Sequence, residues 1–167
     1  GGAVARPGHA RPGRVGSGGV LAAVAHLHIG DGGVLGAVGL CPARLAAAEG
    51  AKIVAFPELS LTGYELALAN DLAFSENDPR LSSLLDLAAS QGTTLVVGAP
   101  VRVGSVLHIG AFILFLDRTT ELYTKHRLGA FPPSASCDSC DGSTVPPPEA
   151  TVFEPGDRNP LVRFGEN

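Results

Sequence analysis

The sequence predicts an α/β domain built on a mixed sheet. Short apolar, β-branched runs alternate with helical patterns along the chain, which is typical of layered α/β domains. The first of these runs are apolar throughout, which indicates strands covered on both faces. Two later strands are separated by the turn residues 117–120 (DRTT), which predict a hairpin and therefore antiparallel strands in the same sheet.

The start of the chain differs in composition from the rest. Residues 1–19 are mainly Gly, Ala, Arg and Pro, and we expect them to form a disordered tail. We expect residues 20–167 to form the domain. Twelve of the 22 glycines fall within the first 40 residues, and five of them interrupt residues 29–40. Glycine weakens a helix, so this stretch is predicted to be irregular.

The first half of the domain contains three predicted elements. Residues 20–27 (VLAAVAHL) form a short apolar run and predict a buried strand. A helix is predicted over residues 42–49, because Pro42 suits a first helical position and Gly50 a C-terminal stop. Residues 52–56 (KIVAF) predict a central strand.

The second half contains one clear helix and several strands. Asp78 followed by Pro79 predicts a helix start, Leu81, Leu84, Leu85 and Ala88 form its apolar stripe, and Gly92 ends it. Strands are predicted over residues 93–99, 106–116 and 121–126. Residues 129–150 contain five prolines and predict a loop. Residues 151–153 and 161–164 are candidates for short edge strands.

Composition narrows the classes of function. The formal net charge is -4, which gives no general electrostatic reason to expect nucleic acid or an anionic membrane as a partner. The longest apolar run, residues 109–116, is too short to span a bilayer. No secretory signal pattern is visible, and three cysteines make an odd number, so a cytoplasmic location is expected. The sequence contains no methionine, which indicates a processed, trimmed or partial chain.

Two ionisable residues follow predicted strands. Glu58 comes after the strand at residues 52–56, and Lys125 lies near the end of the strand at residues 121–126. A carboxylate beside an apolar strand can act as a general base, and a lysine in the same cleft can stabilise an oxyanion. The alternative is that Glu58 caps a turn and that Lys125 is a solvated hairpin residue.

Several segments resemble the nitrilase superfamily of carbon–nitrogen hydrolases. Residues 50–64 (GAKIVAFPELSLTGY) are similar to its first signature, in which an apolar strand leads into Phe-Pro-Glu and Thr-Gly-Tyr follows. Residues 95–102 (LVVGAPVR) look like its next strand, and residues 111–128, with YTKHRL at 123–128, are similar to its second signature. Residues 153–156 (FEPG) resemble the stretch before its nucleophile strand.

This resemblance implies both a fold and a mechanism. The fold is an α-β-β-α sandwich with mixed sheets, of which this chain supplies the N-terminal part. The activity is hydrolysis of a non-peptide carbon–nitrogen bond in a small-molecule amide or nitrile by Cys, Glu and Lys, without a cofactor or metal. Glu58 is implied to be the general base and Lys125 the oxyanion-stabilising lysine. Glu149 is the candidate for a second glutamate, with a solvated loop carboxylate as the alternative. The family also implies a homo-oligomer.

The implied nucleophile has no counterpart among the three cysteines. The resemblance places it on a strand shortly after the FEPG stretch, whereas Cys41 precedes Glu58 and is most simply a small core residue. Cys137 and Cys140 follow Lys125 by 12 and 15 residues in a Pro- and Ser-rich loop. We therefore expect the chain to be a fragment that is inactive by itself.

Three other functions are open to this sequence. The Cys137–Cys140 pair has redox or zinc spacing, but a zinc site needs two more ligands and no second C-x-x-C exists. A non-catalytic half-domain that binds or pairs with a complementary chain is the main alternative. A nucleotide-binding domain would need a Gly-rich phosphate loop, and residues 29–33 (IGDGG) match neither common form.

Overall fold

The computed structural model describes residues 22–24, 37–129 and 148–162, with side chains described from Ala43 onward. The strands are β1 (Ala22–Val24), β2 (Ile53–Ala55), β3 (Thr94–Val103), β4 (Val106–Leu114) and β5 (Thr120–Thr124). The α-helices are α1 (Ala37–Ala48), α2 (Ala69–Leu72) and α3 (Ser82–Gln91). The short 3-10 helices are η1 (Leu66–Leu68), η2 (Pro79–Leu81) and η3 (Glu149–Thr151).

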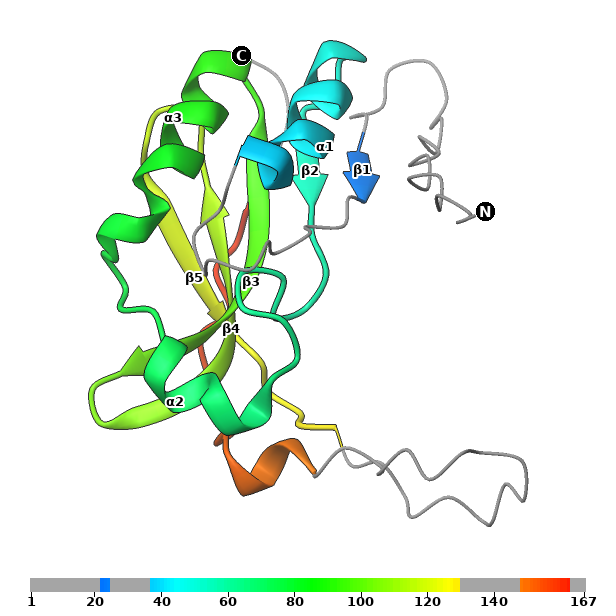
Figure 1. Ribbon diagram of the computed structural model, residues 1–167. Coiled ribbons are helices and arrows are strands. Elements are labelled where there is room, and N and C mark those ends of the chain that lie inside the picture. The colour runs from blue at the N-terminus through cyan, green and yellow to red at the C-terminus, as the bar shows by residue number, and fades with distance from the viewer. Residues whose placement is uncertain (1–21, 25–36, 130–147, 163–167) are drawn as a thin grey trace, which may run out of the picture.

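The described strands form one mixed sheet in the order β1-β2-β3-β4-β5 (Figure 1). β1, β2 and β3 are parallel, whereas β4 and β5 are added antiparallel. The turn at residues 115–119 joins β4 to β5, with Arg118 at a φ of 69° and the Asp117 side chain accepting a hydrogen bond from the Thr119 N–H at 2.9 Å. The predicted hairpin and the mixed sheet are therefore confirmed.

Helices α1 and α3 cover one face of this sheet and contact each other (Figure 1). The predicted cap at Asp78 is present, because its side chain accepts a hydrogen bond from the Arg80 N–H at 3.0 Å, but it caps η2, and α3 begins after η2 at Ser82. Gly92 ends the helix in the left-handed conformation at a φ of 60°. The main core lies between the helices and the strands and includes Val54, Leu84, Val97 and Phe112, all fully buried.

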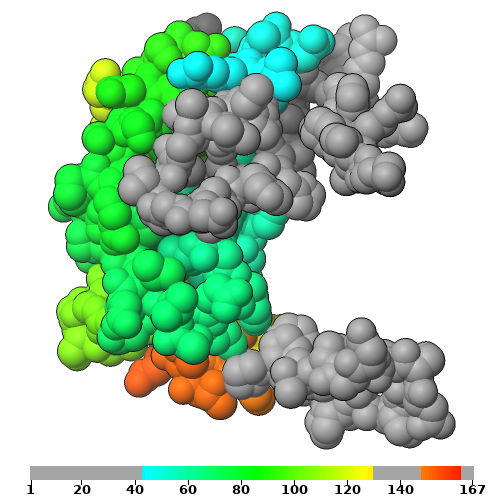
Figure 2. Space-filling model, in the orientation of Figure 1, coloured from blue at the N-terminus to red at the C-terminus, as the bar shows by residue number. Residues whose placement is uncertain are grey.

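A second apolar cluster lies at the end of the sheet where α2 and η3 are neighbours (Figures 1 and 2). Its buried members come from the turn after β2, from η1 and α2, from β4 and from the segment after η3: Leu59, Leu66, Ala69, Leu107, Ile109 and Phe153. This cluster joins segments that are nearly 100 residues apart in sequence, and it forms the support for the site described below.

Several predicted elements differ from the structure in their bounds or their type. Helix α1 begins at Ala37 rather than Pro42, so the glycine-rich stretch contributes its last residues to the helix. The edge strand predicted at residues 151–153 is wrong, because residues 149–151 form η3. Of the strand predicted at residues 161–164, the two described residues form no strand. Much of the predicted loop at residues 129–150 lies outside the described residues.

In the part of the chain that the structure describes, no helix has the length and apolar character needed to cross a membrane.

Candidate active site

Glu58, Lys125 and Glu149 meet at the end of the sheet. Glu58 follows β2 in a turn, Lys125 is the first residue after β5, and Glu149 begins η3. The Lys125 Nζ lies 2.7 Å from Oε2 of Glu58 and 2.9 Å from Oε2 of Glu149. The structure thus brings together all three residues that the sequence singled out, although Glu149 is 91 and 24 positions away from the other two.

The second apolar cluster holds these residues in place. Leu59 is adjacent to Glu58 in sequence, Leu128 follows Lys125 closely, and Phe153 follows Glu149, and all three pack in that cluster. The backbone adds further bonds, because the Lys125 N–H donates to the Ile109 carbonyl at 2.8 Å. Each charged side chain therefore projects from a segment that is fixed by neighbouring apolar residues.

The two carboxylates have different environments. The Glu149 side chain is 2% exposed and accepts hydrogen bonds from the Gly129 N–H at 2.6 Å, the Tyr64 hydroxyl at 2.8 Å and Lys125 at 2.9 Å. The Glu58 side chain is 39% exposed and contacts Lys125 through one oxygen. Glu149 is thus fixed by three donors, while Glu58 stays open to a bound molecule.

These contacts shift the pKa values of the network. Burial acts to raise the pKa of Glu149, but its bonds from Gly129, Lys125 and Tyr64 outweigh burial and lower it. Partial burial acts to lower the pKa of Lys125, but its bonds to Glu58 and Glu149 outweigh burial and raise it. The pKa of Tyr64 is raised by burial and by its bond to Glu149. Glu149 and Lys125 are therefore both charged at neutral pH.

A cavity of about 220 Å³ lies beside Glu58 and Lys125. Its wall combines these two charged residues with the small and apolar residues of the sheet: Phe56, Pro57, Gly98, Ile109, Gly110, Ala111 and Tyr123. Glu149 and Tyr64 are not among the residues that line it. A small molecule in this cavity would meet one carboxylate and one ammonium group against an apolar background.

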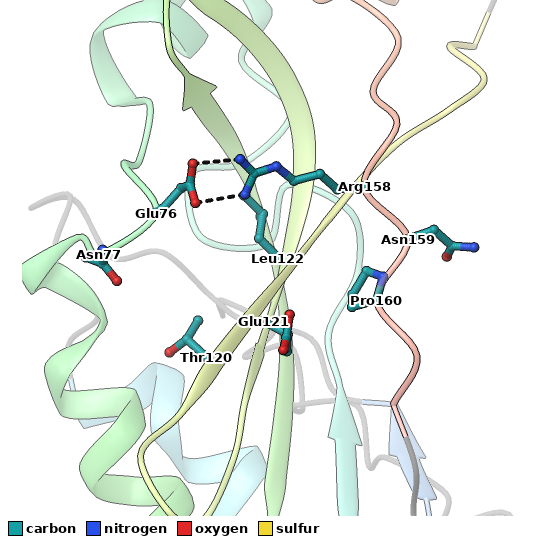
Figure 3. A pocket seen from close by; sticks show the side chains of 8 residues that line it. All are labelled: Glu76, Asn77, Thr120, Glu121, Leu122, Arg158, Asn159 and Pro160. Carbon is teal, nitrogen blue, oxygen red and sulfur yellow. Dashed lines mark hydrogen bonds and ion pairs between the residues drawn. The ribbon is translucent and has the colours of Figure 1, made fainter.

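A larger hollow of about 370 Å³ lies elsewhere, beside β5 and the C-terminal segment (Figure 3). Glu76 and Arg158 form two hydrogen bonds of 2.8 Å at its edge, as the dashed lines in Figure 3 show. Glu76 and Arg158 are therefore paired with each other, whereas the Glu121 carboxylate also lines the hollow. It contains none of the residues that the sequence singled out, so size alone does not identify the site.

Sequence reasoning assigned no role to Tyr64 or Gly129. Tyr64 closes the Thr-Gly-Tyr of the first signature, so the motif contained a signal, but its partner Glu149 lies 85 residues away. Gly129 acts through its backbone N–H, which has no sequence signal.

Cys41 lies in α1, Cys137 and Cys140 lie outside the described residues, and the described side chains include no cysteine. Among the described residues, no group of three or more His, Cys, Asp or Glu could hold a metal ion.

This chain is similar to known proteins in both sequence and fold. Residues 21–162 match the carbon-nitrogen hydrolase family. The glutamine-dependent NAD(+) synthetase of Mycobacterium tuberculosis is 34% identical over 123 residues, which cover 65% of this chain and 18% of that protein.

Solved structures share the fold. A CN-hydrolase superfamily protein from Xanthomonas campestris has a TM-score of 0.57 at 15% identity, with 74% of this chain and 41% of that chain covered. A Nesterenkonia amidase in complex with butyramide has a TM-score of 0.54 at 23% identity, with 74% and 42% covered. This chain spans less than half the length of these relatives. The family match over most of the sequence, together with the shared fold, shows that the chain belongs to the carbon–nitrogen hydrolase family.

Proposed function

We propose that this chain carries the glutamate and lysine of an active site that hydrolyses small-molecule carboxamides. The observation that carries the proposal is the position of Lys125, which lies between Glu58 and Glu149 at the wall of a cavity. In this proposal Glu58 is the general base, Lys125 stabilises the oxyanion, and Glu149 holds Lys125 in place.

Glu58 suits the role of general base because it is accessible. It lines the cavity, is more exposed than Glu149 and has one ionic partner. A carboxylate that faces the substrate can take a proton from a thiol and return it to the leaving amine, and such proton transfer contributes roughly 10²- to 10⁴-fold to rate. Glu149 is less suited, because it is buried, does not line the cavity, and has its oxygens occupied by three donors.

Lys125 suits the oxyanion role because it stays protonated. The bonds to both carboxylates raise its pKa, although partial burial opposes them. A fixed ammonium group beside the reacting carbonyl stabilises the negative charge that develops on oxygen in the transition state. Glu149 contributes by fixing the ammonium group, so little reorganisation is needed when the substrate binds.

The proposed reaction uses a cysteine nucleophile. Glu58 takes the thiol proton as sulfur attacks the carboxamide carbon, and the proton passes to the leaving nitrogen as the C–N bond breaks and ammonia departs. Water, activated by Glu58, then cleaves the thioester to give the carboxylic acid and the free thiol. We propose that this cysteine lies outside the 167 residues and that the chain alone is inactive, since Cys41, Cys137 and Cys140 do not fit the expected position.

The proposed substrates are primary carboxamides. The similar Nesterenkonia structure holds butyramide, and the similar synthetase is named for its dependence on glutamine, so both are associated with compounds bearing a primary amide. The higher identity to the synthetase favours glutamine as the first substrate to test, at 34% against 23%. Nitriles remain a second class, because the same thiol attack applies to a nitrile carbon.

The experiment compares this chain with the complete product of its gene. Ammonia release is measured from glutamine, butyramide and a short aliphatic nitrile. We expect the complete product to release ammonia and the 167-residue chain to release none. Glu58→Gln and Lys125→Met should each lower kcat by roughly 10²-fold or more.

The cysteine substitutions provide the controls. Cys41→Ser, Cys137→Ser and Cys140→Ser in the complete product should keep wild-type activity, because the proposal gives them no role in catalysis. Loss of activity in one of them, together with a mass increase on that cysteine after reaction with iodoacetamide, would place the nucleophile inside this chain. If the complete product hydrolyses none of the compounds, the binding half-domain becomes the better explanation.

A further inference from the structure

The backbone of β3 is open beyond the end of β2. The two strands pair as far as Ala55 and Val96, and the Phe56 N–H then donates to the Val96 carbonyl at 2.8 Å. The chain next turns away from the sheet through Pro57 and Glu58. The following outward-facing position on this edge of β3 is Gly98, whose N–H and C=O need other partners because both are buried.

Ser60 and Leu61 supply those partners. The Gly98 N–H donates to the Ser60 hydroxyl at 3.1 Å, and the Leu61 N–H donates to the Gly98 carbonyl at 2.9 Å. The Ser60 hydroxyl also donates to the same carbonyl at 3.4 Å. The side chain of Ser60 therefore takes the place that a residue of β2 would hold in a longer ladder, and it attaches the turn to the strand.

The turn that carries Glu58 lies directly on Gly98. A Cβ atom at this position would lie 2.6 Å from the Leu59 nitrogen, 2.8 Å from the Pro57 carbonyl oxygen and 3.0 Å from the Glu58 Cα. No side chain larger than hydrogen fits there without a shift of the turn. The Glu58 backbone is therefore placed by contact with β3 as well as by its connection to β2.

Leu59 adopts an unfavourable backbone conformation in the same turn. Its φ is 53°, in the left-handed region that bulky residues rarely adopt. Such a conformation costs free energy, so it persists only where surrounding contacts hold it, and it relaxes when they are lost. Ser60 follows Leu59 in the chain, and its hydrogen bonds with Gly98 fix it in place. These bonds therefore oppose relaxation of the Leu59 backbone.

We propose that Ser60 is a positioning residue for Glu58, acting through its two hydrogen bonds with the Gly98 backbone. Loss of the hydroxyl would leave a buried N–H without a partner, let the left-handed turn relax and move the Glu58 carboxylate away from Lys125. The inference rests on the proposed function for its effect on rate, but its effect on the Glu58–Lys125 contact is independent of any activity.

The test compares Ser60→Ala with Ser90→Ala. Ser90 lies in α3, and its hydroxyl donates to the Leu87 carbonyl away from the site, so it is a matched control. Amide exchange of Gly98 reports the loss of the bond. NMR titration of the Lys125 ammonium group in the 167-residue chain reports its contact with Glu58. Values of kcat and KM for a carboxamide are measured in the complete gene product.

In Ser60→Ala we expect faster Gly98 exchange, a lower pKa of Lys125, and a fall in kcat of roughly 10- to 100-fold with KM within about twofold, as expected for a misplaced catalytic group. Ser90→Ala should match the wild type. An unchanged Lys125 titration despite faster Gly98 exchange would overturn the proposal. If Ser60→Ala does not fold, Ser60→Cys, whose thiol is a weak hydrogen-bonding group, gives the same comparison. A wild type without amidase activity would refute the proposed function and leave the titration test intact.

Discussion

At the scale of single residues, burial separates two glutamates that share one lysine. Both lie within 3 Å of the Lys125 ammonium group, yet one is 2% exposed and the other 39%. The buried one collects donors from the backbone and from Tyr64, because a buried carboxylate without them would be strongly destabilised. The exposed one contacts Lys125 and lines the cavity. Their chemistry therefore differs although their side chains are identical.

Tyr64→Phe tests how Glu149 is kept ionised. The substitution removes the hydroxyl that donates to Glu149 at 2.8 Å and keeps the ring. We expect the pKa of Glu149 to rise, because one of the three bonds that lower it is lost while burial still acts to raise it. The free energy of unfolding at neutral pH should fall by about 1 to 2 kcal/mol. Carboxyl-carbon NMR across the acid range measures the pKa.

Tyr123→Phe is the matched control for this change. Tyr123 is the other of the two tyrosines in the sequence and stacks on His126 with ring centroids 5.5 Å apart. Its substitution should leave the Glu149 titration unchanged. Equal titration curves for Glu149 in the wild type and in Tyr64→Phe would show that the hydroxyl does not stabilise the carboxylate.

The sequence predicted which residues would meet, but it did not predict how. Glu58 and Lys125 follow strands, and the signatures around them indicated a shared site. Glu149 was open to interpretation as a solvated loop carboxylate, because its burial depends on Phe153 and Leu59 packing in one cluster. The role of Gly129 could not be predicted at all, since a backbone donor leaves no pattern in the sequence.

At the scale of elements, packing outweighs local propensity. The glycines before Pro42 predicted a helix start at that proline, yet α1 begins at Ala37. Its contacts with β2 and α3 are the tertiary interactions that offset the roughly 1 kcal/mol cost of a glycine such as Gly39. After Glu149, local hydrogen bonds decide the structure instead. The strand predicted at residues 151–153 is replaced by η3, because the Glu149 carbonyl accepts from the Val152 and Phe153 N–H groups.

Asp78→Ala tests the cap of the η2–α3 unit. The Asp78 carboxylate accepts from the N–H groups of Arg80 and Ser75, and hydrogen bonds with Arg80 lower its pKa to about 2 although burial opposes them. We expect a loss of about 1 to 2 kcal/mol of unfolding free energy at neutral pH. A lowered pKa gives stability that is present above the unfolded value of 3.8 and is lost as the pH falls toward 2.

Urea denaturation at neutral and acid pH measures this effect. Asp86→Ala is the control, because Asp86 forms an exposed ion pair with Arg118, with side chains 61% and 60% exposed, and such pairs contribute little. Asp86→Ala should stay within about 0.5 kcal/mol of the wild type. If Asp78→Ala is no less stable than this control, Asp78 does not stabilise the η2–α3 unit by capping η2.

At the scale of the whole molecule, one charged network joins segments from both halves of the chain. The network is centred on Lys125 and also contains Glu58, Tyr64, Gly129 and Glu149. Removing the single cation from that network leaves two carboxylates near each other, one of them buried. The dependence of global stability on pH should therefore respond to Lys125 more than to Lys52, the other lysine of the sequence.

Lys125→Met should change the sign of that pH dependence. In the wild type the lowered pKa of Glu149 gives stability that is present above its ordinary pKa of 4.5 and is lost as the pH falls below that value. In the variant the bonds from Gly129 and Tyr64 still act to lower the pKa of Glu149, but burial and the nearby charge of Glu58 act without the opposing lysine, so we expect this pKa to lie above 4.5. Stability should then be about 3 kcal/mol lower at pH 7 and should partly recover as the pH falls toward 5, because protonation removes the buried charge.

Urea denaturation at pH 5 and pH 7 measures the two free energies. Lys52→Met, which changes an exposed lysine, should follow the wild type at both values. A uniform loss at both pH values in Lys125→Met would mean that Glu149 does not depend on Lys125 for its charge, and the proposed division of roles between the two glutamates would lose its physical basis.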